Sequence, residues 1–76
     1  MDVSFNVLSS LSFVNAFPRL ESIVADSNAL NVPQSLSVMP TVTTLSLNDN
    51  KIDNLELLVV FVRQVFPNVT FLSLLK

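Results

Sequence analysis

Few side chains in this sequence could carry catalysis. Histidine, cysteine, tyrosine and glycine are all absent from the 76 residues. The chain therefore has no imidazole base, no thiolate nucleophile and no glycine loop to hold a phosphate. The closest carboxylates are Asp49, Asp53 and Glu56, with Lys51 among them, and their order suits a turn and a helix cap better than a cation site. We expect no enzyme activity, no cofactor and no metal site.

Asparagine is the other polar residue with a regular spacing. Asn6, Asn28 and Asn50 are separated by 22 residues. A short amide can donate to and accept from buried backbone groups where a chain turns back after a strand. We predict that the three side chains stack as a ladder; the alternative is three surface turn residues that share a period.

The residues around these asparagines repeat as well. The run VTTLSLNDNKI at 42–52 fits the pattern L-x-x-L-x-L-x-x-N-x-L. The same slots recur 22 residues earlier and restart 27 residues later. An apolar residue and a proline precede each strand, at Phe17-Pro18, Met39-Pro40 and Phe66-Pro67. A period of this length with this consensus is typical of a leucine-rich repeat solenoid.

We therefore predict an α/β leucine-rich repeat solenoid of about three repeats. A short parallel β-sheet should form its concave face, with irregular or 3₁₀ segments and one α-helix on its convex face. The whole of 1–76 would be a single segment, with repeats at about 1–19, 20–41 and 42–68 and an incomplete one at 69–76. We expect both ends to be uncapped, as in a truncated product or part of a longer protein, and self-association through those ends is a second expectation.

The predicted strands at 20–26 and 42–48 should alternate their side chains between the core and the concave face. Ile23, Ala25, Leu45 and Leu47 are the expected inward residues. The outward residues form three columns, which are Ser22, Thr44 and Phe71; Val24, Ser46 and Ser73; and Asp26, Asn48 and Leu75. We predict that this face binds a protein partner, with Phe71 as the best anchor. The alternative is a merely solvated face.

The segments between strands have different patterns. From Leu8 to Ile23 every third residue is apolar, which favours a 3₁₀-like segment over an independent helix. Pro33 should keep the next return path short. That path runs through Gln34, Ser35 and Val38, with Leu36 pointing inward.

The third return path has five extra residues and helical spacing. Asp53 and Glu56 have the spacing of a capping box with Asp53 as the N-cap. A helix of roughly three turns should follow, with an inward face made of Leu55, Leu58, Val59, Val62, Val65 and Phe66. Its other face holds Leu57, Val60 and Phe61. These three either form a contact surface or lie against a neighbouring segment.

Turns without glycine need other residues at positive φ. The candidates are Asn28, Asn31, Asn48, Asp49, Asn50, Asp53 and Asn54. The net charge of −2 comes from ten scattered charged residues, so we expect no direct contact with nucleic acid. Apolar runs are too short to cross a membrane, and the lack of cysteine and of a signal peptide favours a cytoplasmic, or alternatively nuclear, location.

The runs LESIVADSNAL, MPTVTTLSLNDNKIDNLELL and FPNVTFLSLLK resemble the intracellular subfamily of the leucine-rich melanocyte differentiation-associated protein. The resemblance covers about 17–76 and rests on the core at 40–58, the helical repeat ending at Pro67 and the terminal FLSLL. It implies a non-enzymatic cytosolic adaptor linked to melanocyte differentiation or vesicle trafficking. Spliceosomal and phosphatase-regulating leucine-rich repeat proteins share the general repeat, so a ribonucleoprotein component or a phosphatase regulator is the alternative. The asparagine turn and cysteine-containing cap that follow the last strand in the subfamily are absent here.

Overall fold

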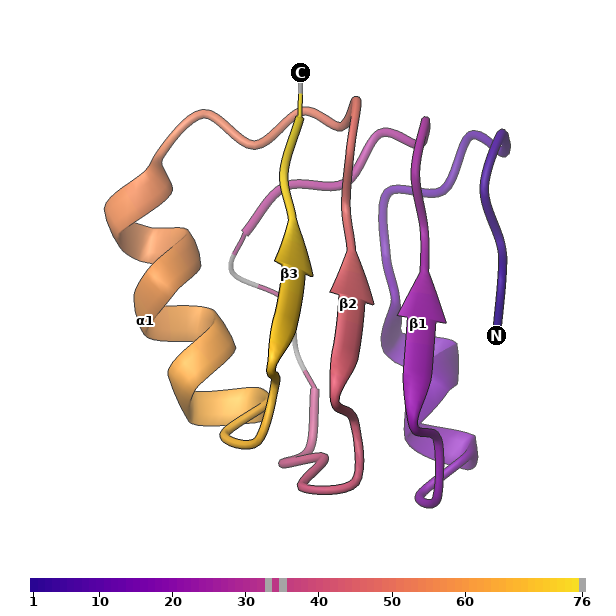
Figure 1. The fold of residues 1–76 in the computed structure, drawn as a ribbon. Coiled ribbons are helices and arrows are strands. Elements are labelled where there is room, and N and C mark those ends of the chain that lie inside the picture. Colours follow the sequence, from indigo (N-terminus) through magenta and orange to yellow (C-terminus); the bar gives the residue numbers. More distant parts are fainter. Residues whose placement is uncertain (33, 35, 76) are drawn as a thin grey trace.

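The sheet and one helix organise the fold. The computed structural model describes residues 1–32, 34 and 36–75. Three strands form a parallel sheet in the order β1-β2-β3 (Figure 1). The elements in chain order are the 3₁₀-helix η1 (Ser12–Ala16), β1 (Ser22–Val24), β2 (Thr44–Ser46), the α-helix α1 (Leu55–Val65) and β3 (Phe71–Ser73). The chain is α/β, as predicted, and is compatible with a leucine-rich repeat segment.

Successive strands pair in the register that the 22- and 27-residue spacings predict. Ile23 lies beside Leu45, and Leu45 lies beside Leu72. Regular strands cover only three residues each, so they are shorter than the predicted 20–26 and 42–48. Backbone bonds continue past their ends, since the Leu47 N–H donates to the Ser73 carbonyl at 2.9 Å. Successive repeat units of the chain, which we call coils, therefore run parallel to one another beyond the ends of the regular strands.

The N-terminal residues lie along β1 as a further extended segment (Figure 1). The Val3 N–H donates to the Val24 carbonyl, and the Val24 N–H donates to the Met1 carbonyl, both at 2.8 Å. The Ser4 N–H donates to Asp2 Oδ1 at 2.9 Å and holds the pKa of that carboxyl below its usual value. This segment pairs with β1 in the parallel orientation, as β1 pairs with β2.

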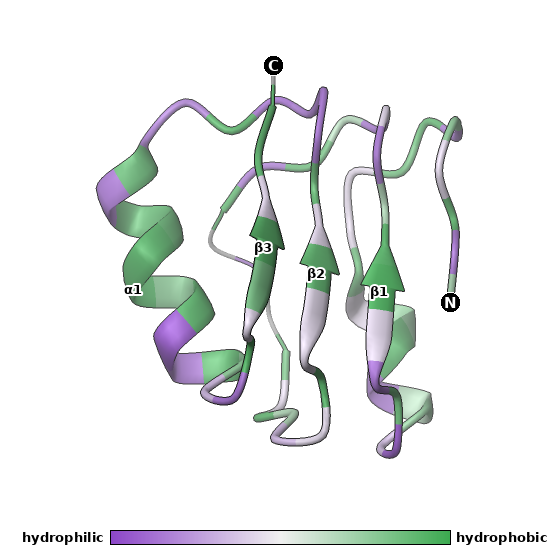
Figure 2. Cartoon of the chain, viewed as in Figure 1, coloured by the Kyte–Doolittle hydropathy of each residue, from purple (hydrophilic) through white to green (hydrophobic). Residues whose placement is uncertain are grey.

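The core lies between the sheet and the segments behind it. Ile23, Ala25, Leu45 and Leu47 are buried, which confirms the predicted inward side of the strands. Further fully buried side chains are Val14, Val42, Leu58 and Phe66, which lie outside the three regular strands. In Figure 2 polar and apolar residues alternate along β2, whereas β1 and β3 each carry two successive apolar residues.

The return segments match the expected irregular and 3₁₀ structure in part. Helix η1 confirms the 3₁₀ segment, with Val14 as its buried residue. In the second return path Leu36 is partly buried against the core, whereas Val38 is exposed. The predictions made for Pro33 and Ser35 lie outside the described residues.

Helix α1 starts one residue later than its sequence motif suggested. Asn54, not Asp53, is the N-cap, because the Asn54 side chain accepts a hydrogen bond from the Leu57 N–H at 3.1 Å. The predicted capping box is wrong for the same reason, since the third helical position is Leu57 and not Glu56. Glu56 instead lies in the first turn, where a negative charge stabilises the positive end of the helix dipole.

The buried stripe of α1 differs from the predicted one. Its buried residues are Leu58, Phe61, Val62 and Val65, at the i, i+3, i+4, i+7 spacing of one helix face. Phe61 was expected outside, but its ring packs edge-on against Phe66, with 5.9 Å between ring centroids. Leu55 and Val59 were expected inside and are 59% and 45% exposed.

Outside the buried stripe, α1 carries exposed apolar side chains beside the polar Glu56, Arg63 and Gln64. Leu57 and Val60 are 47% and 51% exposed, as expected for its outer face. Green segments therefore appear around most of the helix in Figure 2. No described helix is long and apolar enough to pass through a membrane.

Candidate functional site: the open face of the sheet

One face of the sheet is turned away from the core, and we call it the open face. The strand register places its side chains in the columns that the sequence predicted. Ser22, Thr44 and Phe71 are paired neighbours, and so are Val24, Ser46 and Ser73. Asp26, Asn48 and Leu75 follow at the carboxyl ends of the strands, where a chain of hydrogen bonds joins them.

The series of hydrogen bonds begins at Asp26. Its Oδ1 accepts from the Ser46 hydroxyl at 2.6 Å and from the Asn48 N–H at 2.8 Å. The carboxylate therefore holds two groups of the following coil, and bonds to an ionised acceptor are stronger than neutral ones.

Asn48 repeats the arrangement one coil later. Its Oδ1 accepts from the Ser73 hydroxyl at 2.8 Å and from the Leu75 N–H at 2.6 Å. Its Nδ2 donates back to Ser46 Oγ at 3.2 Å. We call Asp26, Ser46, Asn48 and Ser73 the outer ladder. Sequence reasoning placed all four on this face but missed the bonds between them, although their recurrence at coil spacing was a usable signal.

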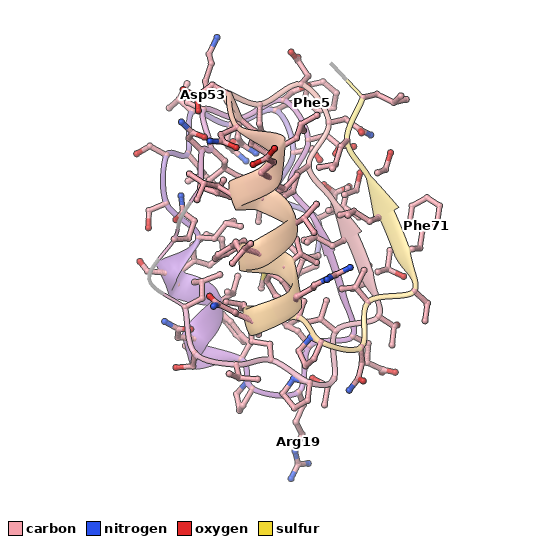
Figure 3. The ribbon with its side chains drawn as sticks, turned by 90° about the vertical axis from the view of Figure 1, so that its left-hand side faces the viewer. Phe5, Arg19, Asp53 and Phe71 are labelled. Atoms are coloured by element: carbon pink, nitrogen blue, oxygen red, sulfur yellow. The ribbon has the colours of Figure 1, made fainter. Side chains whose placement is uncertain are left out.

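The outer ladder changes which residues a partner can reach. Ser46 was expected to face solvent, but it is only 7% exposed because its hydroxyl is enclosed between the two neighbouring side chains. Phe71 and Leu75 are 57% and 73% exposed. Figure 3 shows Phe71 pointing away from the body of the molecule on the β3 side. The accessible apolar surface of the open face is therefore concentrated at β3.

Asn28 joins two coils inside the fold. Its Nδ2 donates to the carbonyls of Val3, Ala25 and Asp26 at 3.1 to 3.2 Å. Its Oδ1 accepts from the Leu8 N–H at 3.2 Å. The side chain is buried, so it satisfies backbone groups that water cannot reach.

Asn50 makes the equivalent bonds one coil later, and Asn6 does not. Asn50 Nδ2 donates to the Ala25 carbonyl at 3.0 Å, and its Oδ1 accepts from the Leu30 N–H at 3.1 Å. Asn6 is exposed and bonds only within its own turn, to Val3 and Ser4. The expected stack of three amides is therefore a pair, the buried Asn28 and the partly buried Asn50, because no described coil lies on the far side of Asn6.

Three turn residues with positive φ also recur every 22 positions. They are Phe5, Ser27 and Asp49, with φ values of 60°, 56° and 54°. Of the predicted candidates, only Asp49 has this conformation. The left-handed region is costly for a residue with a bulky side chain, and Phe5 has no polar group that could compensate locally.

Replacing Phe5 with asparagine should stabilise the chain by about 1 kcal/mol, because asparagine tolerates the left-handed conformation better. The midpoint of urea unfolding would measure this change. Val7→Asn is the matched control, since Val7 is exposed in the same segment without a positive φ. Equal midpoints for the two variants would contradict the assigned strain.

The candidate cation ligands are not brought together. Asp49, Asp53 and Glu56 are all exposed, and Asp49 Oδ2 accepts from the Ser27 hydroxyl at 3.2 Å. Within residues 1–32, 34 and 36–75, no three acidic side chains form a group that could hold a metal ion. Asp49 therefore belongs to the turn between coils.

Comparison with known proteins gave one informative relative. No family model and no solved structure matched the chain. The human leucine-rich melanocyte differentiation-associated protein is 39% identical over 66 residues, which are 87% of this chain and 33% of that protein. The chain thus spans about a third of the length of this relative. On both motifs and identity, it resembles the leucine-rich melanocyte differentiation-associated protein.

Proposed function

We propose that this chain is a leucine-rich repeat solenoid segment that binds a protein partner through the open face of its sheet. Three features that recur at coil spacing support the solenoid: the amide bonds of Asn28 and Asn50, the outer ladder, and the positive-φ turns. In such an array each unit contacts only its neighbours, and the parallel strands form one continuous face.

The exposed apolar pair at β3 is the observation that carries the binding proposal. Phe71 and Leu75 are exposed beside a ladder whose polar groups already bond to one another. Such a face loses little conformational entropy when a partner docks, because its backbone and polar side chains are held in place. An aromatic side chain on a preorganised surface is the usual centre of an interface. The proposed partner therefore presents an apolar element, such as one face of a helix, to β3.

The role that we assign is non-enzymatic. It is supported by the absence of histidine, cysteine and tyrosine from the sequence. The name of the human relative supports a role in melanocyte differentiation, and the lack of cysteine supports a cytoplasmic location. An adaptor role in vesicle trafficking is part of the same proposal. No direct contact with nucleic acid is proposed, since the four basic residues form no cluster in the sequence.

Phe71→Asp should weaken partner capture at least about 30-fold, which is the loss expected for a central interface residue. The immobilised 76-residue chain would be incubated with pigment-cell cytosol, and bound proteins would be quantified by mass spectrometry. The control is Val60→Asp, because Val60 is 51% exposed but lies on α1. Circular dichroism would show that both variants keep the fold.

A protein that the wild type and Val60→Asp capture equally, and that Phe71→Asp loses, would support the proposed face. If every captured protein bound Phe71→Asp as well as the wild type, the open face would be rejected as the binding site. Ser46 is unsuitable for this test, because its buried hydroxyl bonds to Asp26 and a large substituent would disturb the sheet.

A further inference from the structure

Two carboxylates lie at the carboxyl ends of β1 and β2, at the edge of the open face. Asp26 follows β1 and is partly exposed, and Asp49 lies in the turn after β2 and is exposed. Asp26 accepts its two hydrogen bonds at Oδ1, and Asp49 accepts its one at Oδ2. The other oxygen of each carboxylate has no partner among the described residues. We call this pair the acidic rim, and each of its members can accept a donor from outside the molecule.

No described basic side chain neutralises the acidic rim. The basic residues of the described part of the chain form no ion pair, and they are Arg19, Lys51 and Arg63. Figure 3 shows Arg19 extending from the end of the molecule opposite Asp53, and Arg63 lies in the last turn of α1. The rim therefore keeps its negative charge, and such a charge attracts a positively charged partner.

Apolar side chains occupy the β3 end of the same face, in slots that earlier coils fill with polar residues. Phe71 pairs in register with Thr44. The Leu75 N–H donates to Asn48 Oδ1 as the Asn48 N–H donates to Asp26 Oδ1, so Leu75 takes the slot of Asn48 one coil later. Thr44 and Asn48 are themselves partly exposed, which means that both slots point outward. The exposure of Phe71 and Leu75 therefore follows from the direction of their slots and not from their position in the chain.

The open face is thus apolar at β3 and negative towards β1, and the spacing of strands sets the distance between the two regions. Neighbouring strands lie about 4.8 Å apart, which places Asp49 about 5 Å and Asp26 about 10 Å from the coil of β3. A helix that crosses the strands advances about 1.5 Å per residue. Residues about four and seven positions from one that lies over β3 therefore reach Asp49 and Asp26.

These three helix positions lie on one face, because they have the i, i+4, i+7 spacing of an amphipathic helix. An extended peptide would cover the same 10 Å or so in about three residues. Side chains three residues apart in a strand point to opposite sides, so an extended peptide that crosses the strands could not present both of its ends to the open face. The distances favour a helix.

We propose that the partner segment is an amphipathic helix with basic residues beside its apolar anchor, an inference that rests on the binding function proposed above. An apolar side chain of this helix covers Phe71 and Leu75. A Lys or Arg about four positions away donates to the free oxygen of Asp49, and another about seven positions away donates to that of Asp26. One free oxygen on each carboxylate needs only one N–H donor, so Lys serves as well as Arg.

Charge at the edge of an interface decides orientation and choice of partner more than affinity. The acidic rim therefore sets the direction of the helix, since its basic residues must lie towards β1. A helix with acidic residues at those positions is repelled. An uncharged apolar helix binds without a fixed direction.

Selection from a random peptide library tests the chemistry of the partner. Peptides of about 18 residues, long enough to form a helix, would be displayed and captured on the immobilised wild-type chain. Those that Phe71→Asp also captures would be removed. The remaining peptides should contain Lys or Arg four and seven positions from an apolar residue more often than the input library does.

The outcome separates this inference from the binding function. Peptides that depend on Phe71 but show no excess of basic residues at those positions would overturn the inference and leave the open face as a binding site. If no captured peptide depended on Phe71, the binding function would fail, and the inference would fail with it.

Asp26→Asn and Asp49→Asn remove the charges of the rim with little change in shape. Asparagine keeps an acceptor oxygen and tolerates the positive φ of position 49. Each variant should weaken the binding of a selected peptide about 2- to 5-fold, as expected for a partly exposed charge pair. Fluorescence anisotropy of the labelled peptide would measure this. With glutamine in place of the basic residue seven positions from the anchor, the loss for Asp26→Asn should disappear and that for Asp49→Asn should remain.

The double variant Asp53→Asn, Glu56→Gln is the matched control. It removes as much charge as the double variant of the rim, but from exposed positions at the start of α1. It should bind the peptide like the wild type. An equal loss in this control would overturn the proposal, because net charge alone would then explain the effect.

Unchanged affinity of both Asp26→Asn and Asp49→Asn, with circular dichroism spectra like that of the wild type, would also overturn the proposal. If Asp26→Asn disturbs the sheet, Asp49→Asn decides the matter alone, since Asp49 is exposed in a turn. Raising the salt concentration from about 0.05 M to about 0.5 M should weaken peptide binding to the wild type more than to the double variant of the rim.

Discussion

Phe66→Ala should lower the free energy of unfolding by about 3 to 5 kcal/mol, which is the usual cost of removing a buried phenylalanine. Phe66 is 1% exposed and follows the last residue of α1. Its ring packs edge-on against Phe61, with an interplanar angle of 80°. Alanine at this position would leave a cavity at the point where the helix turns towards β3.

Urea unfolding followed by far-ultraviolet circular dichroism would measure this loss. A domain of this length is stabilised by only about 4 to 11 kcal/mol, at 0.05 to 0.15 kcal/mol per residue. The variant should therefore be close to unfolding at room temperature. Phe13→Ala is the control, since Phe13 lies in η1 and is 37% exposed. A loss at Phe66 no larger than that at Phe13 would show that the core is not organised around the end of α1.

Asn28→Ala should cost about 2 to 4 kcal/mol, because a buried group left without its partner costs about 1 to 3 kcal/mol and this change strands more than one. The amide holds the Leu8 N–H and the carbonyls of Val3 and Ala25. Chemical denaturation would give the difference from the wild type.

Asn6→Ala is the matched comparison for Asn28→Ala. Asn6 is exposed and makes only two local bonds, so its loss should cost less than about 1 kcal/mol. Asn28→Asp should fall between these variants, because it keeps the acceptor for Leu8 but loses the donor. Equal costs at positions 6 and 28 would contradict the burial of the inner amide.

The periodicity of the sequence was sufficient to predict the sheet. Ile23, Ala25, Leu45 and Leu47 lie in the core, as predicted, because the alternation of a strand and the 22-residue offset depend only on spacing. The register that pairs Thr44 with Phe71 follows from the same spacing. The type of each element was therefore accessible without coordinates.

Features that depend on a neighbouring coil were not accessible in this way. Asn6 has the same sequence context as Asn28, but it is exposed because burial of the amide needs a preceding coil. Ser46 has the alternation of an outward residue, but the Asp26 carboxylate encloses it. Burial at these positions is a property of pairs of coils, which a single repeat does not encode.

Local choices between similar residues were the other source of error. Asp53 and Asn54 are both good N-caps, and the structure uses Asn54. Phe61 rather than Val59 enters the core, because its ring reaches Phe66. The position of positive φ is set by the turn, so Ser27 and Phe5 adopt it although neither is a preferred residue.

The hydrogen bonds of the outer ladder have a fixed order of donors and acceptors, which deamidation of Asn48 would change. The Asn48 amide donates to the Ser46 hydroxyl, which donates in turn to Asp26. Slow deamidation of Asn48 would replace that donor with a second carboxylate, and one hydroxyl proton would then face two anions. The bond that is lost joins two residues of the same coil, and the charge repulsion that replaces it would weaken the adjoining Ser46–Asp26 bond between two coils, whose backbone bonds remain in place.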